Sequence, residues 1–204
     1  GILVGFISGF IIPVLAQHFI NFHKGFSLYN IGFTAGIVAT MCTAILRSFG
    51  YNVETVYLVS RGNNEPLSLF LLILFGMMLV FGLAANQWSL KRYGELMNES
   101  GHGNNDFIKN YGPGLVFINM ALLGIVFTTY VLIVGGELNG PTIGGIFTVV
   151  GFGASGKHLK NVLPIMLGVF LISYFSVHDV NSTAALLAAL FGTTLAPISG
   201  YYGT

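Results

Sequence analysis

The residues of this sequence best suited to bind a solute are two pairs of uncharged polar side chains at the starts of apolar runs. One pair begins the run 28–46 and the other begins the run 141–154; the four residues are Asn30, Thr34, Asn139 and Thr142. A helix that begins inside a membrane exposes unpaired backbone N–H groups and the positive end of its dipole, and Asn and Thr add further donors and acceptors. This chemistry suits a small neutral or anionic solute. The alternative is that the same residues only cap helices, because Asn and Thr are ordinary N-caps.

His18 is a fifth candidate for the lining of a solute pathway. It lies beside Gln17 within the first apolar run, residues 1–20, where a titratable side chain is expensive to keep. Such a group faces protein or water, so His18 is either a packed, hydrogen-bonded side chain or part of a proton relay. The 5 histidines of the sequence show no i, i+4 pairing with a carboxylate or a second histidine, so we predict no metal site.

Residues 151–156 imitate a nucleotide-binding motif. They read Gly-Phe-Gly-Ala-Ser-Gly, which fits G-x-G-x-x-G, and Lys157 completes the core of a phosphate-binding loop, although His158 stands where a magnesium-binding Ser or Thr belongs. Both motifs require a parallel sheet with helices on its faces, and Pro164 would interrupt the helix needed after the glycines. We predict instead that these glycines pack membrane helices closely, as do the pairs Gly5/Gly9, Gly32/Gly36 and Gly140/Gly144.

The sequence lacks several motifs that would indicate a catalytic, disulfide or metal site. No serine lies in a G-x-S-x-G elbow, and Cys42 is the single cysteine, so neither a disulfide framework nor a cysteine zinc site is expected. We expect a protein that binds no cofactor and is not an enzyme, and we keep a membrane-embedded hydrolase as a third alternative.

The composition indicates that lipid surrounds much of the chain. Of 204 residues, 54% are apolar and only 7% are charged, whereas a soluble domain has roughly 25% charged residues. No window clusters Lys and Arg as nucleic-acid binding requires, so no nucleic-acid partner is expected.

The uncharged runs do not alternate with period two, so they predict helices. Four are long enough to span a bilayer: residues 1–20, 28–46, 67–85 and 114–134. Three are shorter and suit re-entrant or broken helices: residues 141–154, 162–176 and 182–196. The predicted fold is all-α, a polytopic transmembrane helix bundle that occupies residues 1–204 as a single domain.

The distribution of basic residues predicts the orientation in the membrane. If all runs cross, one side holds six basic residues, which are Lys24, Lys91, Arg92, Lys109, Lys157 and Lys160. The other side holds only Arg47 and Arg61. If 28–46 and 141–154 both re-enter, the split is five to three, and if only the second does, it is four to four. The positive-inside rule favours the first topology and places the connector 86–113 in the cytoplasm.

This connector has two interpretations. Trp88, Tyr93, Leu96 and Met97 share a stretch with basic residues, which indicates either a short amphipathic helix in the headgroup region or a solvated loop with an aromatic anchor. In both interpretations residues 100–105, Ser-Gly-His-Gly-Asn-Asn, form a flexible turn.

Two segments of the chain echo one another. Residues 25–38 and 137–150 align without gaps, with Ile31 matching Ile143 and Gly32 matching Gly144, an offset of 112 residues. A polar, glycine-containing lead-in opens a small-residue helix in both, as in an inverted repeat of broken helices. The alternative is chance, because Gly, Ile and Val are abundant here.

Three strings carry a resemblance to a known family: residues 28–36, 156–168 and 191–200. Together they resemble a family of uncharacterised bacterial polytopic membrane proteins, the domain of unknown function 1576. The resemblance implies an all-helical fold in the bacterial inner (plasma) membrane and a fragment of a longer, internally duplicated protein, and it implies no activity. Tyr29-Asn30 is also similar to the half-helix string of urea transporters, although Ile31 replaces their glycine.

These observations support two functional hypotheses. The first is a channel or secondary transporter for a small polar solute. The second is a non-transporting membrane module that assembles through its glycine-rich faces. The expected partners are the lipid bilayer, a small polar solute, and either a second copy or the remainder of the same chain.

Overall fold

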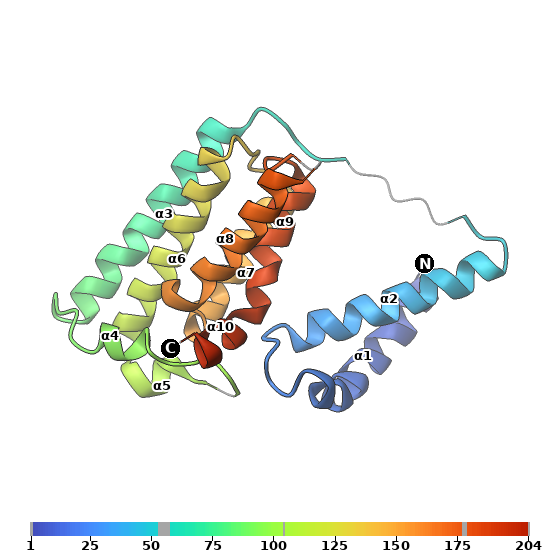
Figure 1. The fold of residues 1–204 in the computed structure, drawn as a ribbon, viewed down its shortest axis with the longest axis horizontal. Coiled ribbons are helices and arrows are strands. Elements are labelled where there is room, and N and C mark those ends of the chain that lie inside the picture. Colours follow the sequence, from blue (N-terminus) through green and yellow to red (C-terminus); the bar gives the residue numbers. More distant parts are fainter. Residues whose placement is uncertain (1, 53–57, 104, 177–178, 204) are drawn as a thin grey trace. The chain divides into compact units, whose positions relative to one another are not determined.

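The computed structural model describes residues 2–52, 58–103, 105–176 and 179–203. Gly1 and Asn104, which belong to two segments discussed above, lie outside them. The described residues form helices and no strand, which confirms the all-α prediction (Figure 1). The chain divides into two compact units, Gly1–Leu58 and Val59–Thr204, which are described separately.

The first unit is a helical hairpin of α1 (Ile2–His23) and α2 (Asn30–Ser48). The chain reverses at Lys24 and Gly25, which have φ angles of 48° and 83°. Only Ala16, Thr34 and Val38 are buried in these two helices. The rest of their apolar surface needs lipid or another protein to cover it.

The second unit is a bundle built around α6. Its helices are α3 (Asn64–Ala85), α4 (Tyr93–Leu96), α5 (Phe107–Tyr111), α6 (Pro113–Ile133), α7 (Gly140–Gly151), α8 (Leu159–Phe175), α9 (Thr183–Gly192) and α10 (Ala196–Tyr202). α6 contacts α3, α5, α7 and α8, and its residues Leu123 and Phe127 are fully buried. The core therefore lies along one face of α3 and around α6.

Glycines bring α3 and α6 close together. A Cβ atom on Gly82 would lie 2.8 Å from the backbone nitrogen of Ile118, and one on Gly124 would lie 2.5 Å from the ring of Phe75. Such close approach is how membrane helices gain packing energy.

The glycines of the G-x-x-x-G pairs do not make close contacts of this kind. A Cβ atom on Gly5, Gly9, Gly36, Gly140 or Gly144 would have no neighbour within 4 Å, and one on Gly32 would approach only its own helix's Tyr29. The prediction that these pairs pack helices is therefore wrong within each unit, because the described helices meet on other faces.

Five helical stretches are long and apolar enough to span a membrane: α1, α2, α3, α6 and the stretch Thr183–Tyr202. The last stretch corrects the prediction of a short run at 182–196. A 3-10 turn, η2 (Thr193–Leu195), joins α9 to α10, so the helical path continues for 20 residues. α7 with its 3-10 turn η1 (Phe152–Ala154) and α8 are shorter. The protein is thus a multi-pass membrane protein.

The connector 86–113 is folded onto one end of the bundle, where Figure 1 shows α4 and α5 beneath α6. Leu96 of α4, Phe107 of α5 and Val116 of α6 form a buried cluster. This packing contradicts the solvated loop, because the short helices contribute to the core, whereas the placement of a helix in the headgroup region stays a prediction. The predicted flexible turn is packed at Gly101, where an added Cβ atom would overlap the carbonyl oxygen of Gly156.

Candidate functional site

The most unusual polar group of the bundle is Lys157, which follows η1 and has no exposed surface. Its Nζ atom donates a hydrogen bond of 2.5 Å to Oγ1 of Thr193 and lies 5.7 Å from the ring centroid of Phe152. Thr193 caps the C-terminus of α9, and its hydroxyl donates in turn to the carbonyl oxygen of Leu190. The amine therefore lies beside the turn at which α9 passes into η2, where the Thr193 hydroxyl accepts its hydrogen bond. Desolvation by burial acts against the cation and lowers the pKa of Lys157 well below its ordinary 10.5.

Asn119 of α6 holds the Lys157 segment from the other side. Its Nδ2 atom donates to the carbonyl oxygens of Gly153 (2.8 Å) and Lys157 (2.7 Å), and its Oδ1 accepts from the hydroxyl of Tyr93 (3.3 Å). Asn119 lies six residues after the start of α6, so at 1.5 Å per residue the segment is recessed about 9 Å along the bundle. Burial raises the pKa of Tyr93 to about 12, so its hydroxyl stays a neutral donor.

His158 ties the connector to the start of α8. Its Nδ1 atom accepts from the backbone nitrogen of Asn161 (3.3 Å), while Nε2 lies 2.8 Å from the carbonyl oxygen of Glu99. Because Nδ1 accepts, the proton belongs on Nε2, which then donates to Glu99, and the ring is neutral. Burial lowers the pKa of His158, which agrees with a neutral ring.

A hollow of about 160 Å³, lined by both polar and apolar residues, opens next to His158. Since a water molecule takes up about 30 Å³ in the liquid, the hollow has room for roughly five waters or one small organic molecule. Glu99 accepts from the hydroxyl of Tyr111 at 2.5 Å, and Lys160 donates to Asn98 at 2.8 Å. The polar residues that line the hollow are Glu99, His158, Lys160, Asn161 and Ser199.

The predicted pair Asn139 and Thr142 forms the N-cap of α7. Oδ1 of Asn139 accepts from the backbone nitrogen of Thr142 (3.1 Å), and Oγ1 of Thr142 accepts from the backbone nitrogen of Asn139 (2.8 Å). This is a capping box, as the capping alternative predicts. The Nδ2 atom of Asn139 is nevertheless buried without a hydrogen-bond partner. A buried, unpaired donor of this kind needs an explanation such as a water or ligand.

The predicted residues of the first unit bond within their own hairpin. Nδ2 of Asn30 donates to the carbonyl oxygen of Ala16 (2.9 Å), and Oδ1 lies 2.9 Å from Nε2 of His23. Thr34 is buried and donates to the carbonyl oxygen of Asn30, whereas His18 is exposed on α1. Asn30 and Asn139 belong to different units, so a shared pathway and an inverted repeat stay predictions.

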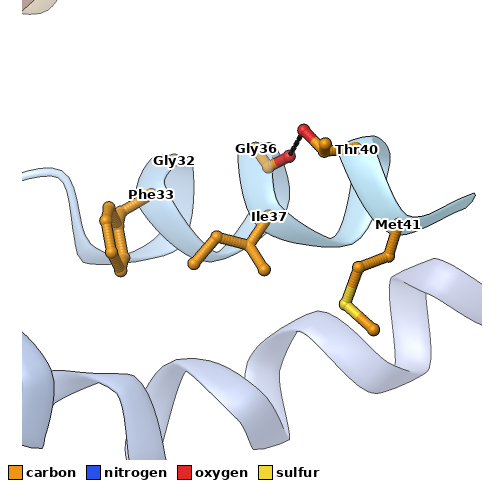
Figure 2. A pocket seen from close by; sticks show the side chains of 6 residues that line it. All are labelled: Gly32, Phe33, Gly36, Ile37, Thr40 and Met41. Atoms are coloured by element: carbon orange, nitrogen blue, oxygen red, sulfur yellow. Dashed lines mark hydrogen bonds between the residues drawn. The ribbon is translucent and has the colours of Figure 1, made fainter. Parts of the chain in front are cut away.

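The same hairpin carries an open groove of about 460 Å³ along α2. Figure 2 shows its lining, which consists of Gly32, Phe33, Gly36, Ile37, Thr40 and Met41. Thr40 donates to the carbonyl oxygen of Gly36 (2.9 Å), so its hydroxyl is satisfied within the helix and the groove is apolar.

Sequence reasoning missed Lys157, Thr193 and Asn119. From the sequence, Lys157 is treated as one more basic residue of a connector, and the glycines before it are assigned to helix packing rather than to a site. The available signal was Asn119, a lone amide within the apolar run 114–134. Within the glycine string the predicted packing is confirmed at Gly153, where a Cβ atom would lie 2.9 Å from Cδ1 of Leu123, and not at Gly151, where it would have no neighbour within 4 Å.

No curated protein and no solved structure matches the chain. One family model, described as "Protein of unknown function (DUF1576)", matches residues 1–48 and 85–204. The match includes every residue of the site around Lys157 and covers most of the sequence. The chain therefore belongs to the DUF1576 family.

Proposed function

We propose that this membrane protein is a channel or secondary transporter for a small polar solute, and that Lys157 and its neighbours form part of the pathway. The observation that carries the proposal is the complete burial of Lys157 within a membrane helix bundle. A basic residue in such a place is expensive and marks an ion or solute pathway by default.

The helices around Lys157 support this proposal. The helical stretch Thr183–Tyr202 contains the 3-10 turn η2, and α7 ends in the 3-10 turn η1, so regular α-helical hydrogen bonding is disturbed at two places near the amine. Transporters build solute and ion sites where helices are interrupted, because the freed backbone groups there can bind polar ligands.

Polar groups at both ends of α7 support it further. The unpaired Nδ2 atom of Asn139 lies at the start of this helix, and Lys157 follows its end. The hollow of about 160 Å³ beside His158 is the size of a small polar molecule and lies next to the same segment.

The test is solute entry into liposomes that contain the full-length protein. Osmotic swelling is followed by light scattering with glycerol, urea, glycine and acetate as probes, for wild type, Lys157→Met and the exposed control Lys109→Met. We expect at least one probe to enter about tenfold faster than in protein-free liposomes, with the acceleration lost in Lys157→Met and kept in Lys109→Met. The proposal fails if no probe is accelerated, or if Lys157→Met behaves like wild type.

A second candidate function is helix assembly through the α2 groove of Figure 2. Gly32 and Gly36 leave an open face on which another helix can approach closely, and Gly140 and Gly144 of α7 do the same. A Cβ atom on Gly36 would have no neighbour within 4 Å, so Gly36→Leu adds side-chain volume to this open face. If the protein assembles there, native mass spectrometry in detergent will show a loss of oligomer for this variant, and an unchanged mass distribution would contradict the assembly role.

A further inference from the structure

The turn that follows α3 has an unusual backbone. Gln87, Trp88 and Arg92 have φ angles of 52°, 54° and 66°, although none of them is glycine. Left-handed conformations are uncommon for such residues and persist only where the surroundings hold them. Here the backbone nitrogen of Trp88 donates to the carbonyl oxygen of Leu83 (2.7 Å), and Asn86 donates to the carbonyl oxygen of Ser89. The turn is therefore a fixed structure that presents particular side chains.

These side chains surround a depression of about 310 Å³. Its polar lining comprises Asn86, Gln87, Ser89, Lys91, Arg92 and Tyr111. Arg92 is held over the ring of Tyr111, 5.0 Å from its centroid. Its Nε atom bonds Glu95 at 3.0 Å, and both partners are largely exposed, so this pair is weak and leaves the terminal guanidinium N–H groups for another acceptor. The depression thus presents an ammonium and a guanidinium together.

Apolar side chains next to the depression indicate where its ligand comes from. Trp88 and Leu90 are 70% and 58% exposed, immediately before the two basic residues. α3 is an apolar helix of 22 residues that ends at Ala85, so this turn lies at the edge of the hydrocarbon. Exposed tryptophan is favoured at that level, and basic residues there attract anionic headgroups.

We propose that this depression binds the phosphate group of an anionic phospholipid. Lys91 and Arg92 contact the phosphate oxygens, Gln87 and Ser89 donate further hydrogen bonds, and Trp88 and Leu90 lie against the upper acyl chains. Free phosphate has the same charge chemistry but no acyl chain, so it would leave Trp88 and Leu90 uncovered.

Trp88 provides the assay, because it is the sequence's single tryptophan. The protein is reconstituted in phosphatidylcholine vesicles with either phosphatidylglycerol or phosphatidylcholine brominated near the glycerol end of the acyl chains, and bromine quenching of the tryptophan is measured. Trp88→Phe identifies the signal of this turn. We expect brominated phosphatidylglycerol to quench more strongly than brominated phosphatidylcholine at equal mole fraction.

The variants test which residues produce this preference. One basic residue near an anionic membrane surface contributes about fivefold to binding. Lys91→Gln should therefore reduce the preference for phosphatidylglycerol about fivefold and the double change Lys91→Gln/Arg92→Gln should abolish it, whereas Lys109→Gln should preserve it.

Equal quenching by both lipids would overturn the proposal, and so would a preference that survives the double change. In vesicles of phosphatidylcholine alone, 20 mM inorganic phosphate should leave the Trp88 spectrum unchanged. A saturable spectral change there would assign the depression to a soluble anion and overturn the lipid assignment.

Discussion

Replacing Lys157 by methionine should make the protein more stable while it removes function. Methionine keeps the length of the side chain without its amine, and the Thr193 hydroxyl keeps its hydrogen bond to Leu190, so no buried polar atom of this pair loses its last partner. Replacing a buried ion pair by apolar side chains of similar volume is often neutral or stabilising by about 1–4 kcal/mol, and a buried amine carries the same kind of desolvation cost. We expect the free energy of unfolding to rise by about 2 kcal/mol at pH 7, within that range.

The same substitution should change how stability depends on pH. Burial lowers the pKa of Lys157 well below 10.5 in the folded protein, while the unfolded chain keeps its ordinary value. Between these two values the unfolded state binds more protons, so the stability of the wild type rises with pH towards 10.5. Lys157→Met lacks this contribution. Its advantage over the wild type should therefore shrink between pH 7 and about pH 9.5, below the range in which unfolded tyrosines ionise.

Thermal unfolding in detergent micelles measures both effects. For a protein of about 200 residues, 2 kcal/mol corresponds to a rise in Tm of roughly 4–8 °C. The exposed control Lys109→Met should change the free energy of unfolding by at most about 0.5 kcal/mol. A lower Tm for Lys157→Met, or an advantage that does not change with pH, would refute the reasoning. Lys157 would then be a structural residue whose hydrogen bonds hold α9 to the end of α7.

Three further predictions concern the same end of the bundle. Gly153→Leu should lower the free energy of unfolding by about 1–3 kcal/mol through overpacking. The control Gly151→Ala should not lower it, because its Cβ atom would have no neighbour within 4 Å. Chemical denaturation compares the two variants, and equal stability would contradict the packing role of Gly153. In Asn110→Cys, at an exposed position, the new cysteine should not be labelled by an impermeant thiol reagent applied to intact cells, because the connector is predicted to be cytoplasmic. Labelling from outside that is absent from a control protein without this cysteine would reverse the predicted topology. Burial lowers the pKa of His158, so its neutral-ring contribution is complete above the unfolded pKa of 6.5 and is lost as the pH falls towards the folded value. His158→Ala should cost about 1 kcal/mol at pH 7.5 and remove that acid sensitivity from the Tm profile, whereas an unchanged profile would exclude His158 as its source.

The spanning helices were readable from the sequence because lipid requires long, uncharged segments. The predicted runs 28–46, 67–85 and 114–134 correspond to α2, α3 and α6 with shifts of three residues or fewer at each end. The predicted run 182–196 is shorter than the observed stretch Thr183–Tyr202, which continues through η2 and α10. In the structure Pro197 lies in the first turn of α10, where its missing N–H group has no consequence.

One part of the candidate site can be predicted from residues close together in the sequence, and the other part depends on contacts between distant residues. The spacing of Asn139 and Thr142 alone predicts a helix start, because their capping box joins residues that are only three apart in the sequence. The burial of Lys157 depends on Thr193, 36 residues further along the chain, and on Asn119, 38 residues before it. No local pattern predicts such contacts, because they exist only when α6, the Lys157 segment and η2 have packed together.

The packing of the connector also has an evolutionary consequence. Loops usually accept substitutions, since their side chains point into solvent. Gly101 and Gly200 reverse this expectation, because an added Cβ atom would overlap a backbone carbonyl oxygen at either position, and Gly101 also has a φ of 73°. A backbone carbonyl group cannot move aside to make room for a Cβ atom, whereas a flexible side chain can. We therefore expect sequence drift in this part of the protein to be confined to the exposed residues around these glycines, and loss of either glycine to require a second change that moves the connector.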